Sequence, residues 1–144
     1  MIEITIRDFK LEFPHHMDAE MLNSCREYLE GFMDVARKYN MAKNKSEIVF
    51  AGLMLVLDNF YTTDAEDDLC EKSFFEIELL GYTYMLEGPV FRKQFYEADA
   101  RIIGDLYCTI QDSYPEKSKD EQHLLTLMYF AYDNFDRWNR NLRY

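Results

Sequence analysis

The sequence predicts a mainly α protein, a compact bundle of four to five helices with an N-terminal β element. Two observations favour this class. Five stretches repeat apolar residues at the three-and-four spacing of a helix, and the 5 Gly and 3 Pro are too few for a turn-rich all-β chain. At 144 residues without a visible linker, residues 1–144 are expected to form a single domain.

Residues 2–13 alternate between apolar and polar side chains. This pattern predicts either one strand with a bulge or two short strands around a turn at Arg7–Asp8, although Arg-Asp lacks the glycine that hairpin turns favour. Because a lone strand cannot satisfy its own backbone groups, we expect its partner elsewhere in the chain or in a second chain. The alternating apolar residues are Ile2, Ile4, Ile6, Phe9, Leu11 and Phe13.

The first helix is expected from Asp18, a good N-cap, to about Tyr39, with Asn40 closing it in the left-handed conformation. Its predicted buried stripe is Leu22, Cys25, Leu29, Phe32, Ala36 and Tyr39. Ser46 then caps a second helix, whose interior Ile48–Leu57 is apolar all round except for Gly52. A helix without a polar face belongs in the middle of a bundle.

The segment 64–78 is the most acidic part of the chain, with seven carboxylates and one lysine. A helix would gather five of those carboxylates within about a third of its circumference. They are Asp64, Asp67, Asp68, Glu71 and Glu78.

The assignment is open after Ser73. We favour a helix over residues 74–86, but Phe75, Ile77 and Leu79 also alternate with glutamates as a strand would. In the alternative, residues 74–86 pair with residues 2–13 in a small sheet, and the class becomes α+β.

Gly88–Pro89 predicts the start of another helix, with proline at its first position, running to about Ser113. Its predicted buried stripe is Phe91, Phe95, Ala98, Ile102 and Leu106.

Ser118 and Glu121 form a capping-box pair that predicts the start of the last helix, which continues to Tyr144. Asp133 and Asp136 each precede an arginine by four residues, which marks the solvent face. The predicted buried stripe is Leu124, Met128, Ala131, Phe135, Trp138 and Leu142.

The formal net charge of −11 argues against direct binding to nucleic acid or to an anionic membrane, since both need positive surface. The longest apolar run, Ile48–Leu57, is ten residues, whereas a membrane-spanning helix needs about 20. No signal peptide is visible, and Cys25, Cys70 and Cys108 have no C-x-x-C spacing. We therefore expect a soluble, cytoplasmic protein with reduced thiols.

No motif for catalysis, metal binding or cofactor binding is present, so we predict no enzyme, no metal and no cofactor. His15, His16 and Asp18 are expected in a solvated loop before a helix cap, and Cys25 within a buried stripe, where thiols are inert. One enzymatic alternative is an all-α Mg²⁺-dependent nucleotide hydrolase. Its carboxylates would be Glu27, Glu30, Asp64, Asp67, Asp68 and Glu71.

The acidic run is the feature that best predicts a function. Its charges, interleaved with aromatic residues, suit a non-enzymatic inhibitor that imitates nucleic acid and blocks a basic partner, such as a nuclease, in the manner of anti-restriction, anti-CRISPR or immunity proteins. The alternative is an assembly module that dimerises through its N-terminal strand. The predicted partner-binding residues are Asp64, Asp67, Asp68, Glu71 and Glu78, with Tyr82 as an aromatic anchor.

Overall fold

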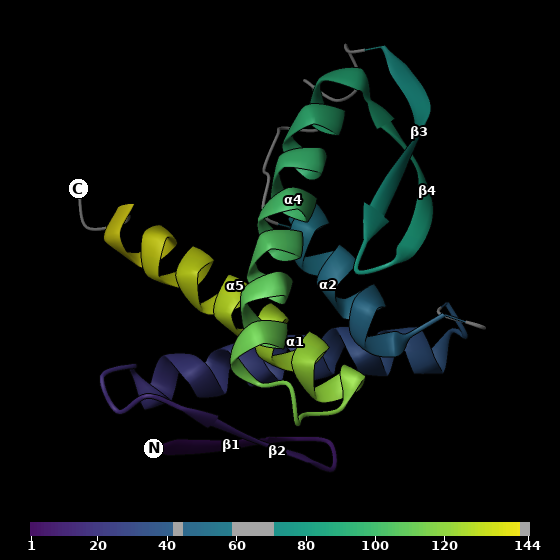
Figure 1. The fold of residues 1–144 in the computed structure, drawn as a ribbon. Helices are drawn as coiled ribbons and strands as arrows, with labels where there is room; N and C mark the ends of the chain where they lie inside the picture. The colour runs from purple at the N-terminus through teal and green to yellow at the C-terminus, as the bar shows by residue number, and fades with distance from the viewer. Residues whose placement is uncertain (42–44, 59–70, 142–144) are drawn as a thin grey trace.

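The computed structural model describes residues 1–41, 45–58 and 71–141 (Figure 1). Within this part, four helices and two β-hairpins pack on a shared hydrophobic core, which confirms a mainly α protein with an N-terminal β element. In chain order the elements are β1 (Ile2–Ile6), β2 (Phe9–Phe13), α1 (Ala19–Lys38), α2 (Glu47–Asp58), β3 (Lys72–Leu79), β4 (Tyr82–Pro89), α4 (Val90–Ser113) and α5 (Lys119–Asn141).

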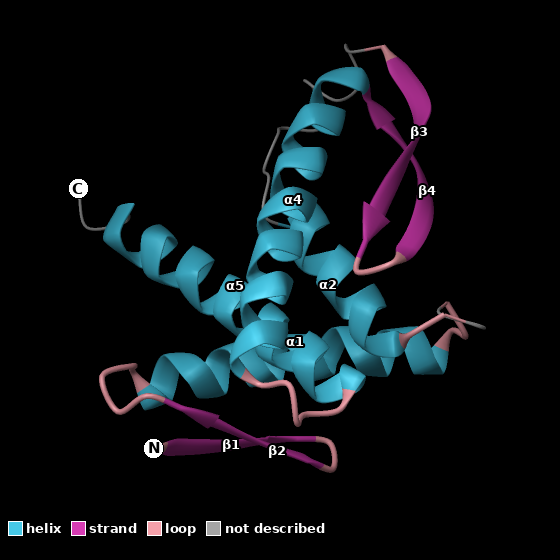
Figure 2. Cartoon of the chain, in the orientation of Figure 1, coloured by secondary structure: helices cyan, strands magenta, loops and turns pink. Residues whose placement is uncertain are grey.

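The two hairpins form separate antiparallel sheets, β1 with β2 and β3 with β4. Figure 2 shows them at different places on the helices, β1–β2 below α1 and β3–β4 beside α4. The helix expected over residues 74–86 is therefore wrong. The alternative is correct in making this segment extended but wrong in its pairing, because β3 pairs with β4 and not with residues 2–13. Of the two interpretations of residues 2–13, two short strands around a turn is correct.

The turn between β3 and β4 explains why the hairpin was missed. Leu80 and Gly81 connect the last strand pair, and both have positive φ, 50° and 86°. Two-residue loops of this kind favour Asn-Gly or Asp-Gly, and a leucine rarely takes a positive φ. Leu-Gly therefore gives no recognisable turn signal, and the flanking apolar residues also fit a helical spacing.

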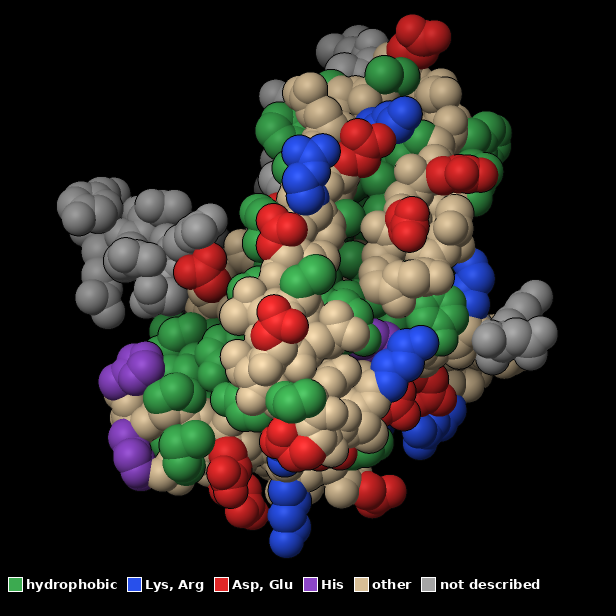
Figure 3. Space-filling model, in the orientation of Figure 1, with side chains coloured by type: hydrophobic (Ala, Val, Ile, Leu, Met, Phe, Trp, Pro, Cys, Tyr) green, Lys and Arg blue, Asp and Glu red, His purple; other side chains and the backbone are tan. Residues whose placement is uncertain are grey.

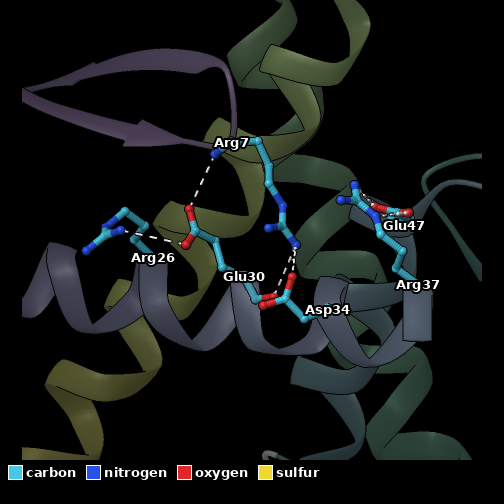
Figure 4. Close-up of polar contacts among 6 residues, drawn as sticks. All are labelled: Arg7, Arg26, Glu30, Asp34, Arg37 and Glu47. Carbon is cyan, nitrogen blue, oxygen red and sulfur yellow. Dashed lines mark hydrogen bonds and ion pairs between the residues drawn. The ribbon is translucent and has the colours of Figure 1, made fainter. Parts of the chain in front are cut away.

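The turn between β1 and β2 is held by the first helix. Arg7 has a φ of 54°, in the left-handed region. Its backbone N–H donates to Glu30 Oε1 at 3.3 Å, and its guanidinium contacts the Asp34 carboxylate and the Glu30 carbonyl oxygen (Figure 4). Arg26, one turn before Glu30, lies 3.7 Å from the other oxygen of its carboxylate. These contacts offset the strain at Arg7 and fix the hairpin on α1.

The predicted helix starts are confirmed by their caps. The Asp18 carboxylate accepts from two backbone N–H groups of α1, and Ser46 Oγ accepts from Val49 N at 3.3 Å. Ser118 and Glu121 form the expected capping box, with bonds of 3.2 and 3.3 Å. Pro89 lies one position earlier than predicted, because it ends β4 and α4 begins at Val90. No helix in the described ranges combines the length and the apolar composition that crossing a membrane requires.

The buried face of α4 differs from the predicted stripe. Phe95 and Ile102 are 43% and 44% exposed, and Ala98 is also exposed. A second set at helical spacing faces the core, and it was overlooked because an aspartate interrupts it. Its members are Tyr96, Asp99, Ile103 and Ile110.

The first half of α5 lies at the centre of the molecule. Leu124, Met128 and Ala131 are buried as predicted, but residues 122–128 are buried on every side, so the expected solvent face is wrong over these turns. The reason is tertiary, since α1, α2 and α4 all pack against α5. The side chains of Trp138 and Leu142 lie outside the described part.

The second helix is buried nearly all round, as its composition predicts. Gly52 is the point at which it approaches α5 most tightly: a Cβ there would lie 2.7 Å from Leu127 Cδ2. Leu127 is fully buried and has little room to move. The glycine is therefore required by packing rather than by backbone conformation.

This contact gives a stability prediction. Gly52→Val should lower the free energy of unfolding by about 1–3 kcal/mol, because the added methyl groups overpack the α2–α5 contact. Gly31→Val is the matched control, since Gly31 is also a helical glycine but a Cβ there meets nothing within 4 Å. Urea denaturation measures both, and equal stability of the two variants would contradict the proposed role of Gly52.

Candidate protein-binding surface

The β3–β4 hairpin turns one side to the core and the other to solvent. Phe75, Ile77, Leu79 and Tyr84 are buried on the inner side. The hairpin face, as we name the outer side, consists of the exposed residues Phe74, Glu76, Glu78, Thr83, Met85 and Glu87. In Figure 3, Asp and Glu side chains are visible over the hairpin.

The strand register arranges the hairpin face as alternating apolar and acidic pairs. Phe74 stands opposite Glu87, and Met85 stands opposite Glu76. Phe74 and Met85 are 70% and 60% exposed, so large apolar side chains lie in water between carboxylates. Side chains on one face of a strand recur about every 6.6 Å. Exposed aromatic and methionine side chains are enriched in surfaces that bind another protein, and the charged groups of such surfaces usually lie at the rim.

The carboxylates of the hairpin face have no ion pair in the described part of the chain, and two lysines lie at its margins. One of them is Lys45, whose Nζ donates to the carbonyl oxygen of Thr83 at 2.6 Å. Glu76, Glu78 and Glu87 make no ion pair with any described residue. Lys72 has the same orientation on β3 but lies at its start, beyond Phe74. The face therefore keeps a local negative charge, which favours a positively charged partner.

The residues predicted to bind a partner have different positions in the structure. Glu78 belongs to the hairpin face, and Glu71 is exposed directly before β3, where its carbonyl accepts from Val90 N at 3.1 Å. These two residues do not share a helical face, because residues 72–79 form a strand. Tyr82 is half-buried and packs against the core. Asp64, Asp67 and Asp68 lie outside the described residues.

Sequence reasoning missed Phe74 and Met85, the two exposed apolar residues of the hairpin face. The alternation of residues 74–79 carries the signal for Phe74, since a strand with buried Phe75 must turn its neighbour outward. The position of Met85 depends on the register, which the Leu80–Gly81 turn sets.

Three of the residues considered for catalysis are engaged elsewhere or buried, whereas His16, Glu27 and Glu71 are exposed. His15 Nε2 contacts the N-terminal amine, and the Glu30 carboxylate is bound by Arg7 and Arg26. Cys25 is fully buried, and desolvation raises the pKa of its thiol to about 12, which keeps it protonated. No group of three or more His, Cys, Asp or Glu side chains suited to a metal ion occurs among residues 1–41, 45–58 and 71–141.

His123 is a buried polar residue that the sequence did not single out for any role. Its side chain is 1% exposed, and neither ring nitrogen has a hydrogen-bond partner in the described part of the chain. The Tyr107 ring lies 4.9 Å away between centroids. Burial, aided by nearby Lys119, lowers the pKa of His123 to about 4, so the imidazole is neutral at pH 7.

In comparisons with protein-family models, curated proteins and solved structures, no match to this chain was found. The functional argument therefore depends on the geometry of the chain itself.

The lowered pKa of His123 predicts how stability depends on pH. Between about pH 6.5 and 4 the unfolded chain binds a proton at this imidazole that the folded chain does not bind. The contribution of neutral His123 to the free energy of unfolding should therefore be complete above pH 6.5 and be lost as the pH falls to 4. This contribution is at most about 3 kcal/mol. His123→Gln should remove this component, whereas His16→Gln, at an exposed site, should keep it.

Urea denaturation at several pH values measures the difference between the two variants, in which the titration of carboxylates cancels. NMR titration of the ring protons provides an independent check on the wild-type protein. An ordinary pKa near 6.5 for His123 would contradict the prediction.

Proposed function

We propose that this protein is a non-enzymatic inhibitor that binds a basic protein through the hairpin face and covers the surface with which that partner binds nucleic acid. The observation that carries the proposal is the composition of this face, with Glu76, Glu78 and Glu87 uncompensated around exposed Phe74 and Met85. The hairpin face thus presents both negative charge and apolar side chains to a partner.

The two kinds of side chain would contribute differently to binding. The glutamates steer a positively charged partner toward the face, which raises the association rate and makes it sensitive to salt. Burial of Phe74 and Met85 in the complex would supply about 1.5–3 kcal/mol each and slow dissociation. An acidic face that is only solvated would not require exposed apolar side chains such as Phe74 and Met85.

The spacing of the charges supports imitation of nucleic acid. Glu76 and Glu78 repeat along one strand, and Glu87 lies on the neighbouring strand of the same face. A phosphate backbone is likewise a regular linear array of negative charge, and a basic groove shaped for it would attract the hairpin face. We place this activity in the cytoplasm, where thiols such as Cys25 and Cys108 stay reduced.

The alternative of an assembly module has less support than it had from the sequence. The N-terminal strand was expected to need a partner, and β2 supplies that partner within the same segment. A second chain is therefore not required to satisfy β1, although the outer edges of the β1–β2 sheet are unpaired in the described structure.

Charge reversal tests the proposed function. A variant with Glu76, Glu78 and Glu87 replaced by lysine should lose at least about tenfold in affinity for the partner at low salt. The matched control reverses three exposed glutamates outside the hairpin face, Glu3, Glu12 and Glu116, so the change in net charge is equal. Affinity capture from a host lysate at low and high salt would identify the partner, and titration with the purified protein would then give both affinities.

The outcomes separate the hairpin face from net charge alone. Equal losses in the two variants would show that only total charge matters, and unchanged affinity in the hairpin variant would exclude the surface. Double-stranded DNA should displace the wild-type protein from its partner; a partner that binds both at once would contradict imitation of nucleic acid.

A further inference from the structure

A cleft of about 740 Å³ lies between the β3–β4 hairpin and α4. In Figure 3 it is seen as a hollow between α4 and the hairpin, with hydrophobic side chains on its floor. One wall is formed by residues 76–78 of β3 with Leu80 and Gly81 of its turn, and the other by residues of α4 from Glu97 to Tyr107. Lys119 and His123, at the start of α5, complete its lining.

The shape of the cleft suits an extended chain. β3 pairs only with β4 in the described structure, so the backbone groups of its other edge are unpaired. Both β3 and α4 begin at the contact between Glu71 and Val90 and run in the same direction (Figure 1). The α4 wall from Glu97 to Tyr107 is about 15 Å long, the length of four to five extended residues.

Small residues on α4 keep the cleft open. Ala100 and Gly104 are one helical turn apart and both line it. A Cβ at Gly104 would meet nothing within 4 Å, so no neighbouring atom requires a glycine there. Glycine inside a helix costs about 0.5–1 kcal/mol relative to alanine. The fold thus carries a destabilising residue at a position where a side chain would enter the cleft.

The two ends of the cleft differ in charge. Glu76 and Glu97 lie toward the starts of β3 and α4, and Lys93 is 3.7 Å from the Glu97 carboxylate. Lys119 lies at the other end, at the start of α5, with Arg101 and Glu78 on facing walls between the two ends. Neither Arg101 nor Lys119 has an ion pair or hydrogen bond within the described ranges. In a protein of net charge −11, two such cations beside one cleft favour an anionic group there.

His123 provides the independent sign of a ligand. It lines the cleft with both ring nitrogens unpartnered, although 99% of its surface is buried (1% exposed). A buried polar group without a partner costs about 1–3 kcal/mol. A ligand with a donor or an acceptor at this position would remove that cost.

We infer that this cleft binds an extended peptide segment, which adds to the free edge of β3 as a third strand. The segment carries a basic side chain at the end near Glu76 and Glu97 and a carboxylate at the end near Arg101 and Lys119. Addition to a strand edge gives affinity through main-chain hydrogen bonds and leaves specificity to the flanking side chains. The inference does not depend on the function proposed for the hairpin face, because the main-chain hydrogen bonds use the edge of β3 opposite β4; Glu76 belongs to both surfaces.

The experiment uses a synthetic array of five-residue peptides with lysine at one end, aspartate at the other, and Val, Thr or Ile between them. Both charge orders are included, because a strand can add in either direction, together with peptides that have lysine or aspartate at both ends. Binding is followed on the full-length protein through the NMR signals of the His123 ring, with His15 and His16 as internal references. At least one lysine–aspartate peptide should shift the His123 signals saturably, and at least about tenfold more tightly than the two-lysine and two-aspartate peptides.

Variants of the two helical glycines provide the structural control. Gly104→Leu should reduce the affinity for the best peptide at least about tenfold by filling the cleft. Gly31→Leu should leave it unchanged, because Gly31 faces open space on α1. Arg101→Glu should reverse the preference at one end, from aspartate to lysine, while the fold is maintained.

The inference is overturned if no array peptide shifts His123 at millimolar concentration, or if Gly104→Leu leaves binding intact. It is also overturned if acetate or inorganic phosphate alone gives the same saturable shift, since the site would then hold a small anion. Failure of this site alone would leave the array peptides unbound, while partner binding is retained by Gly104→Leu and lost in the Glu76, Glu78, Glu87 variant. Failure of the hairpin face alone would leave partner binding intact in that variant, while the array peptides still bind the cleft.

Discussion

Burial of residues 122–128 of α5 on all sides is the constraint on which the rest of the structure depends. The polar residues of this stretch must find partners in the protein, because water cannot reach them. Gln122 donates to the carbonyl oxygen of Tyr114 at 2.9 Å, and Thr126 donates to the carbonyl of Gln122 at 2.8 Å. His123 alone of these three has no partner in the described chain. The packing that forms the core thus also places a neutral imidazole beside the cleft.

The β3–β4 turn has a corresponding role at the surface. Leu80 and Gly81 set the register, and the register decides which side chains face the core. A slip of the register by one residue would turn Glu76 and Glu78 inward and expose Phe75 and Ile77. The loss of the inner packing against α4 would make this slip unfavourable. The charge pattern of the hairpin face is therefore fixed by the core, and its exposed Phe74 is the consequence of a buried neighbour.

The parts of the fold that could be predicted from the sequence are those determined by local interactions. Asp18, Ser46 and Ser118 bond backbone groups two or three residues away, so their caps are visible in the sequence alone. The alternation of residues 74–79 indicated a strand, but the β3–β4 turn was not predictable, because it places Leu80 at a positive φ. The all-round burial of α5 was not predictable either, since it depends on helices that are distant in sequence.

The same distinction applies to the candidate site. The acidic segment and Glu78 are evident from composition, but their relation to one another depends on whether the chain is helical or extended. Phe74 and Met85 become neighbours on one face only through strand pairing. The cleft requires three elements to meet, β3, α4 and the start of α5, and no local pattern encodes that meeting.

The two surfaces are physically connected, because β3 belongs to both. Glu76 and Glu78 are exposed on the hairpin face and also line the cleft. A strand added at the free edge of β3 would widen the sheet and fix these glutamates between two neighbours instead of one. A partner with both a basic surface and an extended segment could engage the two surfaces at once, and the second contact would then be intramolecular and favoured by a high effective concentration. Any change that occupation of one surface makes in the affinity of the other must be reciprocal and of the same factor.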